Sequence, residues 1–219
     1  MPRGRRARPA LAVFCSGQGT NLQAILDAVR GGRLKARVAL VVSDRANAKA
    51  LQRARRAGVP SAYLSPSDYP TRTAYERALI RLCELHGVRL VCLAGFMRIL
   101  TPVFVRRFAG RILNVHPALL PAFPGASAVR DALAWGAKVV GVTVHFVDEQ
   151  VDHGPVILQE PVRVTPGESE ARLLLRVHAV EHRIYPKAIQ LALEGRAKFT
   201  ERRAGGSSAG RNSARSSGG

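Results

Sequence analysis

Short apolar runs alternate along this chain with longer stretches in which apolar residues recur at helical spacing. RLVCLAGF (89–96) is the most continuous apolar run, whereas the apolar residues of 72–86 fall every three or four positions. Apolar runs of this length predict buried strands, and the wider spacing predicts amphipathic helices. The predicted strands are 11–16, 37–44, 61–65, 89–96, 111–117, 139–148 and 156–164, and the predicted helices are 21–32, 47–57, 72–86, 101–110, 127–135 and 165–195.

The order of these elements predicts an α/β fold in a single domain. Strands that are apolar throughout and alternate with helices indicate a mostly parallel, twisted sheet with helices on both faces. We expect this domain to cover residues 10–200. A basic tail (1–9) and a tail rich in Gly, Ser and Arg (201–219) would flank it as disordered segments, because both have too few apolar residues to form a core.

Composition narrows the classes of partner. The formal net charge is +19, which favours anionic ligands, although a general preference for arginine explains it equally well. Aromatic residues make up only 5%, which argues against a nucleic-acid surface that stacks bases. The three cysteines form no CxxC pair, and no apolar run approaches the length of a membrane span. We therefore expect a cytoplasmic protein that binds small molecules, without nucleic-acid or membrane partners.

The segment GQGTN (17–21) lies between the first predicted strand and the first predicted helix. Glycines there let a phosphate approach the free backbone N–H groups at the start of a helix, and Thr20 and Asn21 add side-chain donors. The third glycine of a dinucleotide fingerprint is absent, although Asp44 ends the second strand, where a ribose-binding acid could lie. An ordinary glycine turn remains the alternative.

Asn114 and His116 close the apolar strand 111–117. Being two residues apart, they point to the same face, with Cα atoms about 6.7 Å apart. An amide and an imidazole that converge on one point can stabilise a developing oxyanion. A carboxylate beside the imidazole would fix its tautomer, and the loop 148–152 offers Asp152, with Asp148 and Glu149 as rivals.

A zinc site is the alternative use of these side chains. His116, His145, Asp152 and His153 are all ligand types, but no two of these histidines have HxxxH spacing and no cysteine pair lies beside them. His145 is instead expected to pack or hydrogen-bond between Val144 and Phe146. We expect no metal.

Five blocks of the sequence, in order, resemble the phosphoribosylglycinamide formyltransferase family over about residues 10–200. They are SGQGTNLQAI, LAGFMRIL (93–100), NVHPALLPAFPG (114–125), GVTVHFVDEQVDHGPVILQ (141–159) and EHRIYP (181–186). The resemblance implies a Rossmann-like formyltransferase fold and the use of 10-formyltetrahydrofolate as co-substrate, with no metal. It also implies transfer of the formyl group to the amine of a phosphorylated ribonucleotide in purine biosynthesis.

The resemblance also implies roles for particular residues. Asn114, His116 and Asp152 match the catalytic positions. The ribonucleotide would be held by Gly19, Thr20, Asn21 and Glu181, and the folate by Arg72, Met97, Arg98, Ile99, Leu100, Asn114 and Asp148. Ala118 stands where a serine is usual, and segment 126–130 lacks the histidines that some members carry.

Other assignments remain open at this point. Formyltetrahydrofolate hydrolase and methionyl-tRNA formyltransferase use the same three catalytic residue types, but each normally carries a further domain for which we find no sequence here. A nucleotide-binding protein without catalysis is a more distant alternative. Monomer and homodimer are both compatible with the sequence.

Overall fold

The computed structural model describes residues 7–199, so most of the two predicted tails (1–6 and 200–219) lies outside the described residues. The domain boundaries therefore stay a prediction. The elements are β1 (Ala10–Phe14), α1 (Thr20–Arg30), β2 (Arg37–Ser43), α2 (Lys49–Arg56), β3 (Ser61–Tyr63), a 3-10 turn (Pro66–Asp68), α3 (Arg72–Leu85), β4 (Leu90–Leu93), α4 (Pro102–Arg107), β5 (Ile112–His116), α5 (Ala128–Trp135), β6 (Val139–Phe146), β7 (Val156–Arg163) and α6 (Glu170–Leu193).

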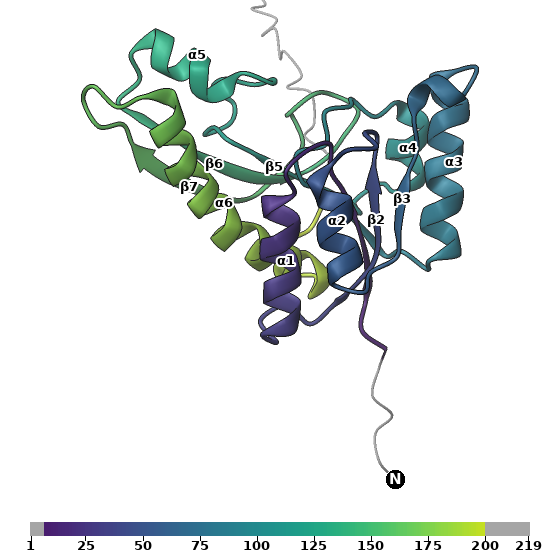
Figure 1. Ribbon diagram of the computed structural model, residues 1–219. Helices are drawn as coiled ribbons and strands as arrows, with labels where there is room; N and C mark the ends of the chain where they lie inside the picture. Colours follow the sequence, from purple (N-terminus) through teal and green to yellow (C-terminus); the bar gives the residue numbers. More distant parts are fainter. Residues whose placement is uncertain (1–6, 200–219) are drawn as a thin grey trace, which may run out of the picture.

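The strands form one seven-stranded sheet in the order β3-β2-β1-β4-β5-β6-β7 (Figure 1). The first five in this order are parallel, whereas β6 and β7 form an antiparallel hairpin at one side. This confirms the predicted mostly parallel α/β sheet. The strands β1 and β4 are buried along their whole length, which explains their unbroken apolar runs in the sequence.

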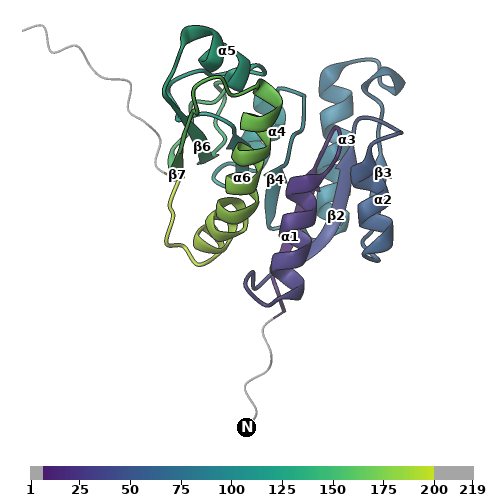
Figure 2. The same cartoon turned by 60° about the vertical axis from the view of Figure 1, so that its left-hand side comes forward.

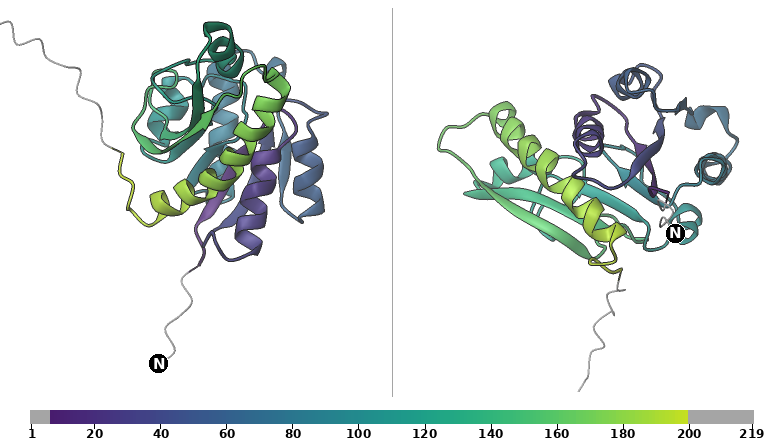
Figure 3. Two further views of the ribbon diagram at one scale, coloured as in Figure 1. Left: turned by 90° about the vertical axis from the view of Figure 1, so that its left-hand side faces the viewer. Right: turned by 90° about the horizontal axis from the view of Figure 1, so that it is seen from below.

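Helices cover both faces of the sheet, as predicted. Buried residues of α1, α2, α5 and α6 pack with one face, and those of α3 and α4 pack with the other. Figure 2 and the two views of Figure 3 show α1 and α6 side by side along the first of these faces. None of the helices within the described residues is long and apolar enough to cross a membrane.

Several predicted boundaries differ from the observed ones by two to five residues, and two of these differences have a clear local cause. The strand predicted for 89–96 ends at Leu93, because Gly95 adopts a left-handed conformation (φ 71°) that takes the chain out of the sheet. The last helix begins at Glu170 rather than at residue 165. Glu168 does accept a hydrogen bond from the backbone of Thr165 (3.0 Å), but this closes a turn, and Ser169 caps the helix instead.

The buried hydroxyl of Tyr185 on α6 ties two neighbouring strands together. It lies 2.9 Å from the carbonyl oxygen of Leu93 and 3.1 Å from that of Leu113, and a hydroxyl donates to such acceptors. These carbonyls belong to the last residue of β4 and to the second residue of β5, one position before Asn114. The contact therefore holds together the two strands from which the polar residues of the next section emerge.

Candidate active site

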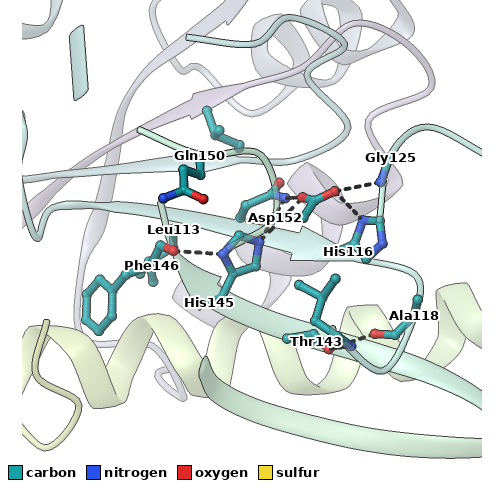
Figure 4. A network of polar contacts seen from close by, with 12 residues as sticks. Leu113, His116, Ala118, Gly125, Thr143, His145, Phe146, Gln150 and Asp152 are labelled. Carbon is teal, nitrogen blue, oxygen red and sulfur yellow. Dashed lines mark hydrogen bonds and ion pairs between the residues drawn. The ribbon is translucent and has the colours of Figure 1, made fainter. Parts of the chain in front are cut away.

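Asn114, His116 and Asp152 come together at the carboxyl end of β5, and Figure 4 shows Asp152 beside His116. Nδ1 of His116 lies 3.5 Å from Oδ2 of Asp152, and Nδ2 of Asn114 lies 3.4 Å from Oδ1 of the same carboxylate. The imidazole is only 4% exposed. The alternation of side chains along a strand thus places the amide and the ring on one face, as predicted, and one acid touches both.

The loop between β6 and β7 determines which carboxylate reaches the histidine. Asp152 has a positive φ of 52°, and its Oδ2 accepts a hydrogen bond from the backbone N–H of Gly125 (2.8 Å). Gly154 closes the loop so tightly that a Cβ there would lie 1.9 Å from the carbonyl oxygen of Phe146. Of the rival carboxylates, Asp148 pairs with His153 (2.7 Å) and Glu149 pairs with Arg106 at the surface.

His145 joins this cluster, which the sequence did not predict. It lies directly across from Asn114 in the antiparallel pairing of β5 with β6, and it is 1% exposed. Its Nδ1 donates to the carbonyl of Phe146 (2.7 Å), which agrees with the expected packing beside that residue. Burial lowers the pKa of His145, so the ring is neutral near pH 7 and its Nε2 carries a lone pair.

The side-chain amide of Asn114 is held by its two neighbours. Nδ2 lies 3.3 Å from the Nε2 lone pair of His145 and 3.4 Å from Asp152, so its two N–H bonds have an acceptor each. Both distances exceed the usual 2.9–3.0 Å of such hydrogen bonds. The amide is therefore oriented by weak contacts, either of which a better acceptor can replace.

Both ring nitrogens of His116 face acceptors. Nε2 lies 2.9 Å from the carbonyl oxygen of Phe123, which can only accept, so this nitrogen carries a proton. Nδ1 faces the carboxylate of Asp152. Each ring nitrogen that carries a proton can therefore donate a hydrogen bond, Nε2 to Phe123 and Nδ1 to Asp152.

The predicted phosphate loop leads into α1 on the same edge of the sheet. Gly19 precedes the helix with φ 68°, and a Cβ there would lie 2.8 Å from Ala50, so α2 packs directly on this glycine. No side chain caps the helix, and the N–H groups of its first turn have no partner within the helix. Thr20 lies at the helix start and borders a 370 Å³ depression that Arg33, Arg53 and His182 also line.

Asn21 does not line this depression, and its side chain contacts the buried carboxylate of Glu181 on α6. Its Nδ2 donates to Oε2 of Glu181 at 2.7 Å. Burial raises the pKa of Glu181 to about 7 from its ordinary value near 4.5, and the hydrogen bond from Asn21 opposes only part of this effect. Two residues that the sequence assigned to one ligand, 160 positions apart, are thus in direct contact.

Glu181→Gln should change how stability depends on pH. In the wild type, the folded protein holds a proton on Glu181 that the unfolded chain releases between pH 4.5 and about 7. The free energy of unfolding therefore falls as the pH rises through this range. Glutamine does not ionise, so the variant does not lose stability in this way. Its free energy of unfolding, relative to that of the wild type, should therefore rise by up to about 3 kcal/mol between pH 5 and pH 8.

Urea denaturation of both proteins at pH 5 and pH 8 measures this gain. Glu84→Gln, which removes a surface carboxylate, is the control and should show no such change with pH. A constant difference between Glu181→Gln and the wild type across this pH range would contradict the raised pKa.

Most of the residues predicted to bind folate surround one cavity of 320 Å³. Its lining includes the side chains of Arg72 and Tyr75 on α3 and the segment after β4, and the full set is Pro66, Arg72, Tyr75, Glu76, Met97, Arg98, Ile99 and Leu100. Asp148 and Asn114 do not line it. The backbone N–H of Met97 donates to the hydroxyl of Ser16 (2.9 Å), so this segment adjoins the phosphate loop.

Two further positions in the sequence are explained by their contacts. Asp44, considered above as a ribose-binding acid, instead pairs with Arg98 at 2.8 Å. Ala118 offers its backbone carbonyl to the hydroxyl of Thr143 (2.6 Å, Figure 4), a contact that needs no particular side chain at residue 118. Within residues 7–199, no three His, Cys, Asp or Glu side chains form a group that could hold a metal ion.

Comparison with known proteins identifies the family. The formyl transferase family matches residues 10–189. Phosphoribosylglycinamide formyltransferase from Escherichia coli is 46% identical over 191 residues, which cover 87% of this chain and 90% of that protein. A crystal structure of glycinamide ribonucleotide transformylase 1 from Symbiobacterium toebii is 53% identical, with a TM-score of 0.86 over 88% of this chain and 91% of that one.

A longer relative shares the same region. The trifunctional purine biosynthetic protein adenosine-3 of Drosophila pseudoobscura is 44% identical over 190 residues, but the chain spans only 14% of its length. The chain therefore belongs to the formyl transferase family, among relatives that are phosphoribosylglycinamide formyltransferases.

Proposed function

We propose that the protein transfers a formyl group from 10-formyltetrahydrofolate to the primary amine of N1-(5-phosphoribosyl)glycinamide in purine biosynthesis. The observation that carries the proposal is the contact of Asp152 with both His116 and Asn114 at the sheet edge. The names of the E. coli and S. toebii relatives support the same reaction. The buried free thiols Cys15, Cys83 and Cys92 agree with the cytoplasmic location that we propose.

The phosphate of the ribonucleotide would bind at the start of α1. Backbone N–H groups of Thr20 and Asn21 without helical partners, together with the helix dipole, favour an anion there. Arg53 supports the loop by donating to the carbonyl of Gln18 (2.9 Å). Glu181, once ionised above about pH 7, would accept hydrogen bonds from the substrate beside Asn21.

The folate would bind in the 320 Å³ cavity and extend toward Asn114. Met97, Ile99 and Leu100 offer apolar contacts to an aromatic ring, and Arg72 and Arg98 offer cationic donors to a carboxylate. Asp148 would line the far end, where the loop 148–152 passes close to β5. This arrangement would bring the formyl carbon next to the amine that attacks it, which supplies much of the rate by proximity.

The three side chains would act on the charge that develops during transfer. When the amine attacks the formyl carbon, the carbonyl oxygen becomes an oxyanion. Asn114 would donate a hydrogen bond to this oxygen and give up its weak contact to His145 or to Asp152. Protonated His116 would donate its Nε2–H to the same oxygen and give up its hydrogen bond to the carbonyl of Phe123. Asp152 would stabilise the charged ring and relay the proton lost by the amine to N10 of the folate. The oxyanion then collapses to the carbonyl as the bond between the formyl carbon and N10 breaks, which leaves the formylated amine and tetrahydrofolate.

A formyl-transfer assay tests the proposal directly. The protein is incubated with the glycinamide ribonucleotide and 10-formyltetrahydrofolate, and the formylated product and free formate are both quantified. We expect product in proportion to the donor consumed, with little formate. Release of formate without transfer would overturn the proposal in favour of a hydrolase. If neither substrate is consumed, the proposal is also overturned, and a nucleotide-binding protein without catalysis is the remaining assignment.

A further inference from the structure

The segment that follows β4 has no regular secondary structure, yet three side chains from other elements hold it. Met97 is fixed through its backbone by Ser16, as described above. Nε of Arg98 donates to Oδ2 of Asp44 at 2.8 Å. The backbone N–H of Thr101 donates to Glu76 on α3 at 2.7 Å. These three anchors fix the side of the cavity that this segment forms.

Asp44 is the least expected of these anchors. It follows the last residue of β2, and its side chain is 1% exposed. One carboxylate oxygen accepts from Arg98, and the other is buried without a hydrogen-bond partner among the described residues. A buried carboxylate is costly unless a charged partner compensates it, so Arg98 is held firmly.

Arg98 is held by only one of its nitrogens. Its side chain is 50% exposed and lines the cavity, and within residues 7–199 its two terminal amino groups have no hydrogen-bond partner. Because Nε is bonded to Asp44, rotation about the end of the side chain is restricted. The planar fork of two amino groups therefore stays available to a ligand in one direction.

A second arginine at the same cavity is backed in a similar way. Nε of Arg72 lies 3.7 Å from the buried carboxylate of Glu76, and its side chain is also more than half exposed. Two guanidinium groups, each paired with a buried carboxylate, thus border a cavity whose other lining residues are largely apolar. Guanidinium forks of this kind recognise carboxylates through paired hydrogen bonds.

We propose that Asp44 is a positioning residue that orients Arg98 toward a carboxylate on the tail of the formyl donor. This inference rests on the proposed function, in which a folate with a glutamate tail occupies the cavity. Asp44 touches neither substrate. It acts through Arg98 and would affect donor affinity, while the formyl-transfer step at His116 would proceed as before.

The test compares two donors in the wild type and in variants. One donor is 10-formyltetrahydrofolate, and the other carries carboxamides in place of both glutamate carboxylates. Asp44→Ala should raise KM for the first donor about threefold to tenfold, the typical cost of ordering one freed side chain. Its kcat, and its KM for the second donor and for the ribonucleotide, should stay within about twofold of the wild type by the same argument.

Further variants separate positioning from a general structural role. Asp44→Asn keeps an acceptor for Nε and should show a smaller effect than Asp44→Ala. Arg98→Ala should weaken binding of the first donor about tenfold or more. Adding Asp44→Ala to this variant should have no further effect on donor binding. Glu84→Gln, which breaks the ion pair with Arg107 between α3 and α4, is the matched control and should behave as the wild type.

Two outcomes would overturn the inference: an equal rise in KM for both donors in Asp44→Ala, or full additivity of the two alanine variants. Dissociation constants of both donors, measured by calorimetry without the ribonucleotide, keep this test independent of the reaction. If the wild type binds the donors but transfers no formyl group, the proposed function fails. The same constants then still support or overturn the role of Asp44.

Discussion

Asp152→Asn should lower kcat for formyl transfer by about 10²–10³-fold while leaving KM for both substrates within a few fold. The variant loses the negative charge that faces Nδ1 of His116 at 3.5 Å, and with it both roles that the proposed mechanism gives to Asp152, stabilising the protonated ring and relaying the proton of the amine. Asparagine tolerates the positive φ of 52° at this position. The loop should therefore keep its conformation, and single-turnover kinetics should isolate the chemical step.

The matched control for this variant is Glu149→Gln in the same loop. Its carboxylate pairs with Arg106 at the surface, so its loss should leave kcat within twofold, since exposed ion pairs contribute little. Equal turnover in Asp152→Asn and the wild type would show that Asp152 is not the carboxylate that assists His116. Thermal melting of both variants checks that the fold is retained.

His116→Asn should also lower kcat by about 10²–10³-fold, the typical loss when one oxyanion donor is removed. Asparagine retains N–H donors but carries no positive charge, and its shorter side chain withdraws from the carbonyl of Phe123. Because His116 does not line the depression at the start of α1, where the phosphate would bind, the ribonucleotide KM should change little. Steady-state kinetics with each substrate varied in turn measures both effects.

His86→Asn is the control for the histidine variant. This histidine follows α3 and hydrogen-bonds the carbonyl of Leu82, outside the candidate site, so its replacement should not affect turnover. A rise in ribonucleotide KM with unchanged kcat in His116→Asn would contradict the proposed role, because it would make His116 a binding residue. Thermal melting of both variants shows whether His116→Asn is folded, so that a loss of activity caused by unfolding can be recognised.

Much of the site could be predicted from short-range patterns. The alternation of a strand places Asn114 and His116 on one face, and the glycine turn before a helix indicates where an anion would bind. The role of Asp152 is implied by the resemblance to a family, because the sequence pattern alone offers Asp152 with Asp148 and Glu149 as rivals. The structure separates the three by their partners: His116 for Asp152, His153 for Asp148 and Arg106 for Glu149.

The contacts that the sequence did not predict all join residues from different elements. His145 was read as a residue of its own strand, yet the register of β6 against β5 places it opposite Asn114. Asp44 was considered for a ribose, yet the path of the chain after β4 brings Arg98 to it. Neither the register nor the path leaves a periodic signal in the sequence.

By itself, the sequence determined the succession of strands and helices, the parallel character of most of the sheet and the face on which the amide and imidazole lie. These follow from backbone periodicity and burial, which act between residues close together in the chain. Only the tertiary structure decided which acid reaches His116, that His145 orients Asn114, and that Glu181 meets Asn21. Such contacts depend on strand register and on loops that bring distant segments together, and a local pattern carries no information about either.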